Sequence, residues 1–190
     1  MFIEEHALWS DEQRAQAREL KKRLEREPLE LVRIAWADPH GASRAKAVSL
    51  PVFLDALENG YNINVATTTL DSAGGRVFKS FTRGGGMGLD EMTGSPNLVV
   101  VPDPATFRVL PWAPGVGWVL CDEYFRDGRP FHFSSRHLLR RQVARLAQKN
   151  ANPELLISRL EVLRKFGVSA LTPLDKFLQI IFHRFSFRFR

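Results

Sequence analysis

The residues whose types could support chemistry gather in a glycine-rich stretch and in the acidic pair that follows it. Residues 83–88 read Arg-Gly-Gly-Gly-Met-Gly, and glycine-rich loops can cradle phosphate groups with their backbone amides. This stretch lacks the lysine and hydroxyl residue of a P-loop, and no helix signal follows at once, as a dinucleotide-binding loop would require. Its turn chemistry therefore favours a surface loop over a phosphate site.

Asp90 and Glu91 come just after this loop. Two adjacent carboxylates could bind a cation or orient an amine for reaction. Exposed carboxylates are more often simply solvated, so the pair by itself leaves both interpretations open.

The histidines and the single cysteine form no catalytic or metal-binding pattern. No histidine lies at zinc-ligand spacing from a cysteine or a carboxylate, and no Ser-His-Asp arrangement can be argued from the order of the residues. Cys121 lies in the apolar run Trp118–Cys121, so we expect a small buried side chain rather than a nucleophile. The five histidines are His6, His40, His132, His137 and His183.

The elements that must position these residues indicate an α+β domain. Ser10–Gln13 has the pattern of a capping box and predicts a helix through about Arg26, which Pro28 ends. Strands are expected at 31–36 and 43–50, followed by a helix from Pro51 to Glu58 with Gly60 as its stop. Further strands are expected at 61–65, 77–81, 98–101, 107–110 and 118–125.

Two strands, a crossing helix and then more strands are the order of a β-grasp sheet, in which the helix covers one face. Helices are expected after the sheet, the first from Ser134 or Ser135 to about Lys149 and two more after Pro153 and Pro173. In the last one, apolar residues from Leu174 to Phe185 recur at helical spacing. They predict a wide apolar face that a partner should cover.

Composition places the chain among ordinary globular proteins, with 190 residues, 44% hydrophobic and 25% charged. No apolar run approaches the roughly 18 residues of a membrane span, and the start lacks a signal-peptide pattern. We therefore expect no membrane association. One cysteine cannot form an internal disulfide, which indicates a reducing, cytoplasmic setting.

The net charge of +6 is concentrated near the end of the sequence. Residues 151–190 hold seven Lys/Arg against three Asp/Glu, so the first 150 residues are nearly neutral. A nucleic-acid interface would have to use the Phe/Arg-rich end at 183–190, which could also contact a membrane surface. Such short basic and aromatic ends are more often incidental, so neither partner is expected.

The run at 99–112 resembles a segment of the glutamine synthetase family. In that family a strand ends in Pro-Asp, a threonine follows three residues later, and Pro-Trp closes the next strand. The same residues stand here at Pro102, Asp103, Thr106, Pro111 and Trp112. The resemblance covers about residues 30–150, and its other pieces are Trp36–Asp38, Gly41, Arg44–Lys46, Gly60, Val119–Asp122, Asp127–Pro130 and Ser135–Leu138.

The resemblance implies a domain plan. Family members have an N-terminal β-grasp domain followed by a larger catalytic domain. We accordingly expect an N-terminal helix at 1–29 and a glutamine-synthetase-like β-grasp domain at 30–133. Residues 134–190 would hold an incomplete start of the catalytic domain with an unrelated helical, basic and aromatic tail.

The resemblance also implies a reaction and partners. Family members use ATP, with Mg²⁺ or Mn²⁺, to phosphorylate the γ-carboxylate of glutamate, and ammonia or another amine then displaces the phosphate. Their subunits form rings in which each site combines one subunit's N-terminal domain with its neighbour's catalytic domain. The expected partners are therefore copies of this chain or intact synthetase subunits.

Two site residues are carried over from the family. The family loop before Pro-Asp reaches the neighbour's site and often bears an acid followed by Gly-Ser-Ser. Arg83 and three glycines stand there instead, and counting back from Pro102 places the family acid nearer Arg83 than Asp90. Asp90 is nevertheless the candidate amine-site acid. Glu161 resembles the first residue of the family's metal-binding Glu-x-Glu, but position 163 is leucine, so we interpret Glu161 as a remnant metal ligand.

Two functions follow as expectations. The first is a truncated glutamine synthetase-like ligase that forms γ-glutamyl amides by descent but is inactive alone, because its reading frame breaks near Val162. ATP and Mg²⁺ or Mn²⁺ would then belong to the family without being bound by this chain. The second is a stand-alone β-grasp module that docks on full-length synthetase subunits. The sequence leaves open whether the chain is an enzyme and which amine its relatives use.

Overall fold

The structure is a computed structural model that describes residues 1–27, 29–79 and 81–148. The chain divides into two compact units, Met1–Ser134 and Ser135–Arg190. The first unit contains a six-stranded sheet and its covering helices. The described part of the second unit is helix α4 (Ser135–Gln148).

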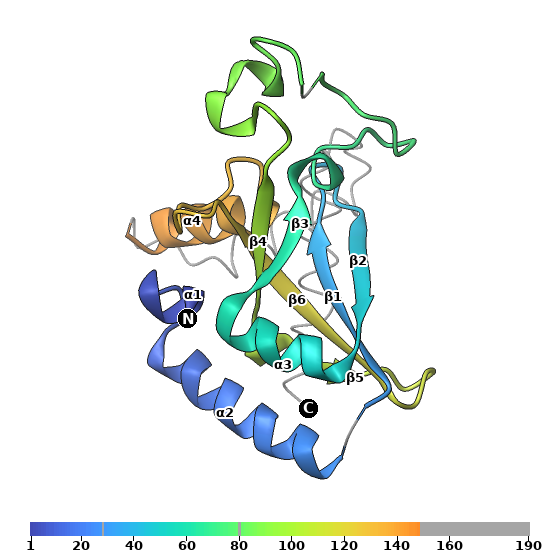
Figure 1. Ribbon diagram of the computed structural model, residues 1–190. Helices are drawn as coiled ribbons and strands as arrows, with labels where there is room; N and C mark the ends of the chain where they lie inside the picture. The colour runs from blue at the N-terminus through green and yellow to red at the C-terminus, as the bar shows by residue number, and fades with distance from the viewer. Residues whose placement is uncertain (28, 80, 149–190) are drawn as a thin grey trace, which may run out of the picture. The chain divides into compact units, whose positions relative to one another are not determined.

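A mixed sheet forms the centre of the first unit (Figure 1). Its strand order is β2-β1-β6-β4-β3, and the short β5 pairs with β6. Strands β1 and β6 run parallel, whereas every other pair is antiparallel. The strands are β1 (Leu31–Ala37), β2 (Ser43–Val48), β3 (Tyr61–Asn64), β4 (Asn97–Pro102), β5 (Arg108–Val109) and β6 (Val116–Tyr124).

Asp38 shapes the turn between β1 and β2. Its buried carboxylate accepts hydrogen bonds from the backbone amides of His40 at 3.0 Å and Ala42 at 2.9 Å. It also accepts one from Nε of Arg44 at 2.9 Å. A buried carboxylate with this many donors is well satisfied, so these residues fix the hairpin.

Helix α3 (Leu50–Asn59), which connects β2 to β3 along the chain, crosses the sheet (Figure 1). Pro51 lies in its first turn, where the missing N–H has no intrahelical acceptor to lose. Phe53 and Leu57 are buried against the strands. Gly60 ends the helix with a φ of +67°, and a Cβ atom at this position would overlap the Val99 side chain.

Two N-terminal helices, α1 (Phe2–Glu5) and α2 (Asp11–Arg26), pack on the same core. A reciprocal capping box starts α2: the Gln13 amide donates to Ser10 Oγ at 3.2 Å, and the Ser10 amide donates to Gln13 Oε1 at 3.1 Å. Between the helices, Trp9 Nε1 donates to the Pro102 carbonyl at 3.1 Å. This bond ties the N-terminal segment to the end of β4.

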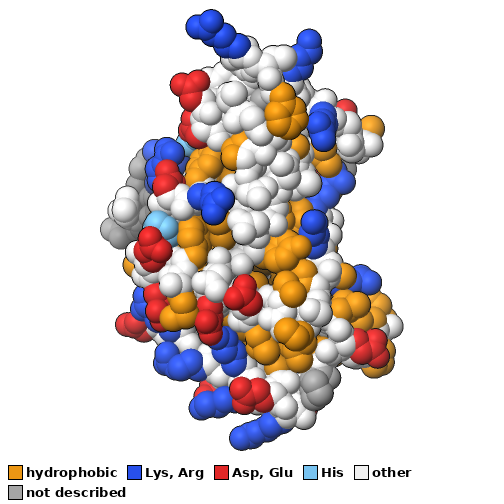
Figure 2. Space-filling view, viewed as in Figure 1, with side chains coloured by type: hydrophobic (Ala, Val, Ile, Leu, Met, Phe, Trp, Pro, Cys, Tyr) orange, Lys and Arg blue, Asp and Glu red, His pale blue; other side chains and the backbone are white. Residues whose placement is uncertain are grey.

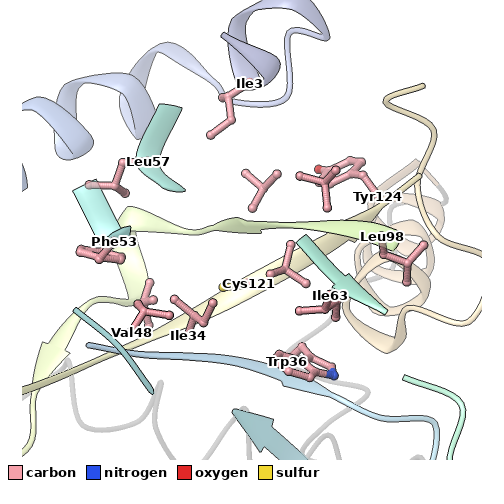
Figure 3. Close-up of a cluster of buried hydrophobic side chains, with 14 of the residues drawn as sticks. Ile3, Ile34, Trp36, Val48, Phe53, Leu57, Ile63, Leu98, Cys121 and Tyr124 are labelled. Atoms are coloured by element: carbon pink, nitrogen blue, oxygen red, sulfur yellow. The ribbon is translucent and has the colours of Figure 1, made fainter. Parts of the chain in front are cut away.

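One apolar cluster joins the N-terminal helices, α3 and the sheet. Figure 3 shows members of this cluster from each part: Ile3 of α1, Phe53 and Leu57 of α3, and strand residues such as Ile34 and Cys121. In Figure 2, charged side chains gather on the outer surface over α2, while apolar atoms are visible nearer the sheet. The helix is therefore amphipathic, with Ala17, Leu20 and Leu24 buried.

The α+β prediction is confirmed, including the mixed sheet with a crossing helix. The expected helices near 10–26, 51–58 and 135–149 are present, and Cys121 is buried as predicted. The strand predicted at 77–81 is wrong, since its described residues form no strand and Val77 and Phe81 are exposed. The helices predicted after 149 lie outside the described residues, and the proposed domain boundaries remain predictions.

None of the helices in the described ranges combines the length and the apolar character that crossing a membrane requires.

Candidate functional site

The candidate residues lie in the long connection between β3 and β4, which extends beyond the ends of these strands (Figure 1). This connection begins with the short turn η1 (Val65–Thr67) and later forms η2 (Gly86–Gly88) and η3 (Asp90–Met92). Met92 is fully buried and belongs to the apolar cluster. Its burial anchors the part of the loop that carries the acidic pair.

The glycines of this loop allow close backbone packing at Gly86. Its φ is +67°, and a Cβ atom would lie 2.6 Å from the Met92 carbonyl carbon and 2.7 Å from the Thr93 nitrogen. The Gly86 amide donates to the Lys79 carbonyl at 3.0 Å, and Thr93 Oγ1 donates to the Gly85 carbonyl at 3.3 Å. The loop is therefore folded back on itself, and at least one glycine has a packing role.

Asp90, the predicted amine-site acid, is exposed at the first position of η3. Its backbone carbonyl accepts from the Thr93 amide at 3.1 Å, and the Met92 amide donates to the Leu89 carbonyl at 3.0 Å. These bonds fix the turn that presents the carboxylate. An exposed carboxylate on a fixed turn can accept a proton or contact a cationic ligand.

Glu91 has a specific partner that its neighbour Asp90 lacks among the described contacts. Its Oε1 lies 2.7 Å from Nε2 of His132, which is 41 positions further along the chain. Both side chains are partly exposed, 30% for Glu91 and 41% for His132. The contact joins the loop before β4 to the segment that follows β6.

The His132 ring is held by its surroundings. It packs edge-on against Phe125 at a centroid distance of 5.0 Å. The Arg129 guanidinium lies 5.4 Å from the centre of the same Phe125 ring and bonds Asp127 through Nε at 2.7 Å. A histidine, an arginine and two carboxylates thus share this corner of the first unit.

These charges shift the acid–base equilibria of the corner. The hydrogen bond from His132 lowers the pKa of Glu91 below its ordinary value of 4.5, with smaller contributions from a backbone hydrogen bond and from attraction to His132 and Arg129. Hydrogen bonds from Arg129 lower the pKa of Asp127, and the same contact raises the pKa of Arg129. Glu91 therefore stays charged to a lower pH than an ordinary glutamate does.

The other histidines that the structure describes are dispersed. His40 places Nε2 3.1 Å from the Leu70 carbonyl, His6 packs edge-on against Phe2, and His137 lies in α4. Within the described residues, no three His, Cys, Asp or Glu side chains form a group that could hold a metal ion. The remnant metal ligand Glu161 lies outside these residues.

The sequence predicted Asp90 but did not predict the Glu91–His132 pair. The acidic dipeptide was visible as a motif, yet nothing in the order of residues links position 91 to position 132. The link depends on the antiparallel pairing of β4 with β6, which places the two connecting segments near each other. The contact between Glu91 and His132 could have been predicted only from the correct strand order.

The comparisons with known proteins agree on one group of relatives, although no family model matches the chain. It is 37% identical over 151 residues to a gamma-glutamylanilide synthase of an Acinetobacter species, covering 78% of this chain and 30% of that protein. A glutamine synthetase of Mycolicibacterium smegmatis is 31% identical, covering 64% of this chain and 24% of that protein. The solved structure of the GmaS/ADP complex matches with a TM-score of 0.52 and 27% sequence identity. The match covers 67% of this chain and 25% of the GmaS chain.

The chain therefore spans less than a third of the length of these relatives.

Proposed function

Because the chain belongs to the glutamine synthetase family, we propose that its first unit is the N-terminal part of a ligase that forms γ-glutamyl amides. The observation that carries this proposal is the 37% identity to a gamma-glutamylanilide synthase across 78% of the chain. That relative's name makes an aromatic amine one candidate substrate, beside ammonia and alkylamines. The expected products are the γ-glutamyl amide, ADP and phosphate.

The proposed reaction has two steps. An oxygen of the glutamate γ-carboxylate attacks the terminal phosphorus of ATP, which gives an acyl phosphate and releases ADP. The amine nitrogen then attacks the acyl carbon, phosphate leaves, and the nitrogen gives up a proton. We assign Asp90 the role of accepting that proton, which is supported by its exposure on the ordered turn η3.

The proposal places the rest of the site on a catalytic partner. We infer that this polypeptide has no ligase activity alone and acts with copies of itself or with intact synthetase subunits. Two observations support this inference: the described residues offer no three-ligand metal group, and position 163, two residues after Glu161, is leucine instead of a second glutamate. ATP and Mg²⁺ or Mn²⁺ would accordingly be bound by intact synthetase subunits and not by this chain or its copies.

Phosphate release tests the proposal. The purified chain is assayed with glutamate, ATP and Mg²⁺, together with ammonia, aniline or isopropylamine, first alone and then mixed with a full-length family member. We expect no activity alone and an amine-dependent change in the mixture. Activity of the chain alone would disprove the inferred need for a partner.

A substitution then tests the role of Asp90. In the mixture, the part of the amine-dependent rate that requires the added chain should fall by roughly 10²–10⁴-fold in Asp90→Asn, the range for loss of a general base. Glu25→Gln, which removes an exposed carboxylate from α2, is the matched control and should change nothing. Equal kinetics for Asp90→Asn and the unsubstituted chain would remove Asp90 from the site.

A stand-alone docking module is the second candidate function. It is favoured by apolar side chains exposed on the β3–β4 connection, where Val77 is 53%, Phe81 77% and Met87 48% exposed. Clusters of exposed apolar residues commonly mark interaction sites. Co-elution with a full-length synthetase, without any change in its kinetics, would support the module over the ligase.

A further inference from the structure

We propose that Glu91 and His132 are a positioning pair that holds the turn carrying Asp90, and so sets the affinity of the site for its amine. The claim about amine affinity rests on the proposed ligase function. The claim that the pair holds the turn concerns the loop alone. The pair is distinct from Asp90 because neither partner is assigned contact with a reacting atom.

The geometry on the loop side makes Glu91 an effective holding point. Glu91 is the middle residue of η3, between exposed Asp90 and buried Met92. Met92 fixes one side of the turn in the core, and the hydrogen bond that His132 Nε2 donates to Glu91 Oε1 at 2.7 Å fixes the other side. A turn held at two successive residues leaves little freedom for the third.

The geometry on the far side makes His132 a firm support. Its neighbour Phe131 is buried, and the Phe131 amide donates to the Glu123 carbonyl of β6 at 2.9 Å. The His132 ring contacts Phe125, which in turn packs edge-on against Phe131 at 5.5 Å. The loop is thereby connected to the central strand of the sheet.

The partial exposure of the pair argues for a local role. Ion pairs at solvent-exposed sites contribute little to global stability because water screens them. The pair lies at 30% and 41% exposure, so its loss should leave the core intact while releasing the loop. A substitution can therefore separate positioning from folding.

The pair also has a defined response to acid. The charged groups that face Glu91 are His132 and, at longer range, Arg129, which is itself paired with Asp127. Because the pKa of Glu91 is lowered in the folded state, its contribution is fully present above its ordinary value of 4.5. It is lost as the pH falls through the lower, folded-state value.

Hydrogen exchange on the full chain tests the holding role. We expect the amides of Met92 and Thr93, which close η3, to lose protection by about two- to fivefold in His132→Ala, as befits a partly exposed pair. The loss should be smaller in Glu91→Gln, whose amide oxygen can still accept from His132 Nε2. His132→Gln, which keeps a donor near Nε2, should restore part of the protection. Glu19→Gln breaks the exposed Lys22–Glu19 pair on α2 and should leave η3 unchanged.

Acid provides an independent check on the same amides. In the unsubstituted chain, protection corrected for the intrinsic exchange rate should fall as the pH drops through the folded-state pKa of Glu91, which lies below its ordinary value of 4.5. In Glu91→Gln it should no longer respond to that titration, because the titrating carboxylate is gone. Unchanged protection in His132→Ala, or an acid response that persists in Glu91→Gln, would overturn the inference.

Kinetics in the active mixture test whether the pair sets the affinity for the amine. For the part of the rate that requires the added chain, Glu91→Gln should raise KM for the amine several-fold while KM for glutamate and KM for ATP stay constant. The global unfolding midpoint of the chain should also stay constant. A uniform loss of activity with a lowered midpoint would show a merely structural role. If no mixture is active with any amine, the ligase proposal and the claim about amine affinity fail together. The hydrogen-exchange results still decide whether the pair holds the turn.

Discussion

Gly86 illustrates how much the candidate loop depends on a single residue. Its positive φ is one constraint, and the 2.6 Å that would separate a Cβ atom from the Met92 carbonyl carbon is another. A left-handed conformation alone costs a non-glycine residue about 1–2 kcal/mol. Contact with backbone adds to that cost because the neighbouring atoms cannot rotate away.

Gly86→Ala should therefore destabilise the first unit more than Gly84→Ala. Gly84 has a similar φ of +69° but nothing within 4 Å of a Cβ position, so it isolates the conformational cost. We expect about 1 kcal/mol for Gly84→Ala and about 2–4 kcal/mol for Gly86→Ala. Urea unfolding of both variants measures the difference, and equal midpoints would show that the backbone contact is unimportant.

The residues behind the family resemblance have structural roles in the described unit. The Asp103 carboxylate accepts from Gln13 Nε2 at 3.1 Å, and Thr106 Oγ1 accepts from the Leu120 amide at 2.9 Å. Asp38 fixes a hairpin in the same way. Such motifs predicted the fold well because each one fulfils a local bonding need, but they gave less information about the site.

Among the elements, α2 shows the most complete agreement between sequence and structure. Both hydrogen bonds of the predicted capping box at Ser10 and Gln13 are present. Gln13 also bonds Asp103, which follows β4. The cap therefore serves both the helix and its attachment to the domain.

Ser10→Ala should destabilise the protein by about 1 kcal/mol, the usual loss when an N-cap hydroxyl is removed. Ser10→Asp should retain most of the stability because a carboxylate also accepts the Gln13 amide and favours the positive end of the helix. Thermal unfolding followed by circular dichroism measures both variants. A midpoint for Ser10→Ala equal to that of the parent would contradict the cap's role.

The wrongly predicted strand at 77–81 shows why local sequence alone could not predict every strand. Its Val, Phe and Phe residues have high β propensity, but propensity expresses how well a side chain fits a half-buried sheet. The described residues here have no neighbouring strand, and the pairing nearby is limited to an isolated bridge between Leu70 and Arg76. Tertiary pairing, which the local sequence does not contain, decides such cases.

At the scale of the whole first unit, the N-terminal helices are part of the core and not an appendage. Ile3, Trp9, Leu20 and Leu24 belong to the same apolar cluster as the strands. Lys21 also pairs with Glu58 at the end of α3. Helices that share buried surface with a sheet should unfold with it in one transition.

Leu24→Ala should accordingly lower global stability by about 2–4 kcal/mol, since Leu24 is 1% exposed and its removal leaves a cavity. Lys22→Ala, two positions earlier on the exposed side of α2, is the matched control and should change stability by less than about 0.5 kcal/mol. Intrinsic tryptophan fluorescence and circular dichroism should report one shared midpoint in urea. A loss of α2 before the sheet would contradict a common core.

The parallel pairing of β1 with β6 has a consequence for synthesis on the ribosome. Leu31 pairs with Val116, so the partner of the first strand is made last among the long strands. At about 5–20 residues per second, β1 waits roughly 4–17 seconds for it. During that interval the β1–β2 hairpin presents an unpaired inner edge, which makes nascent chains of this length candidates for chaperone capture and for mispairing with one another.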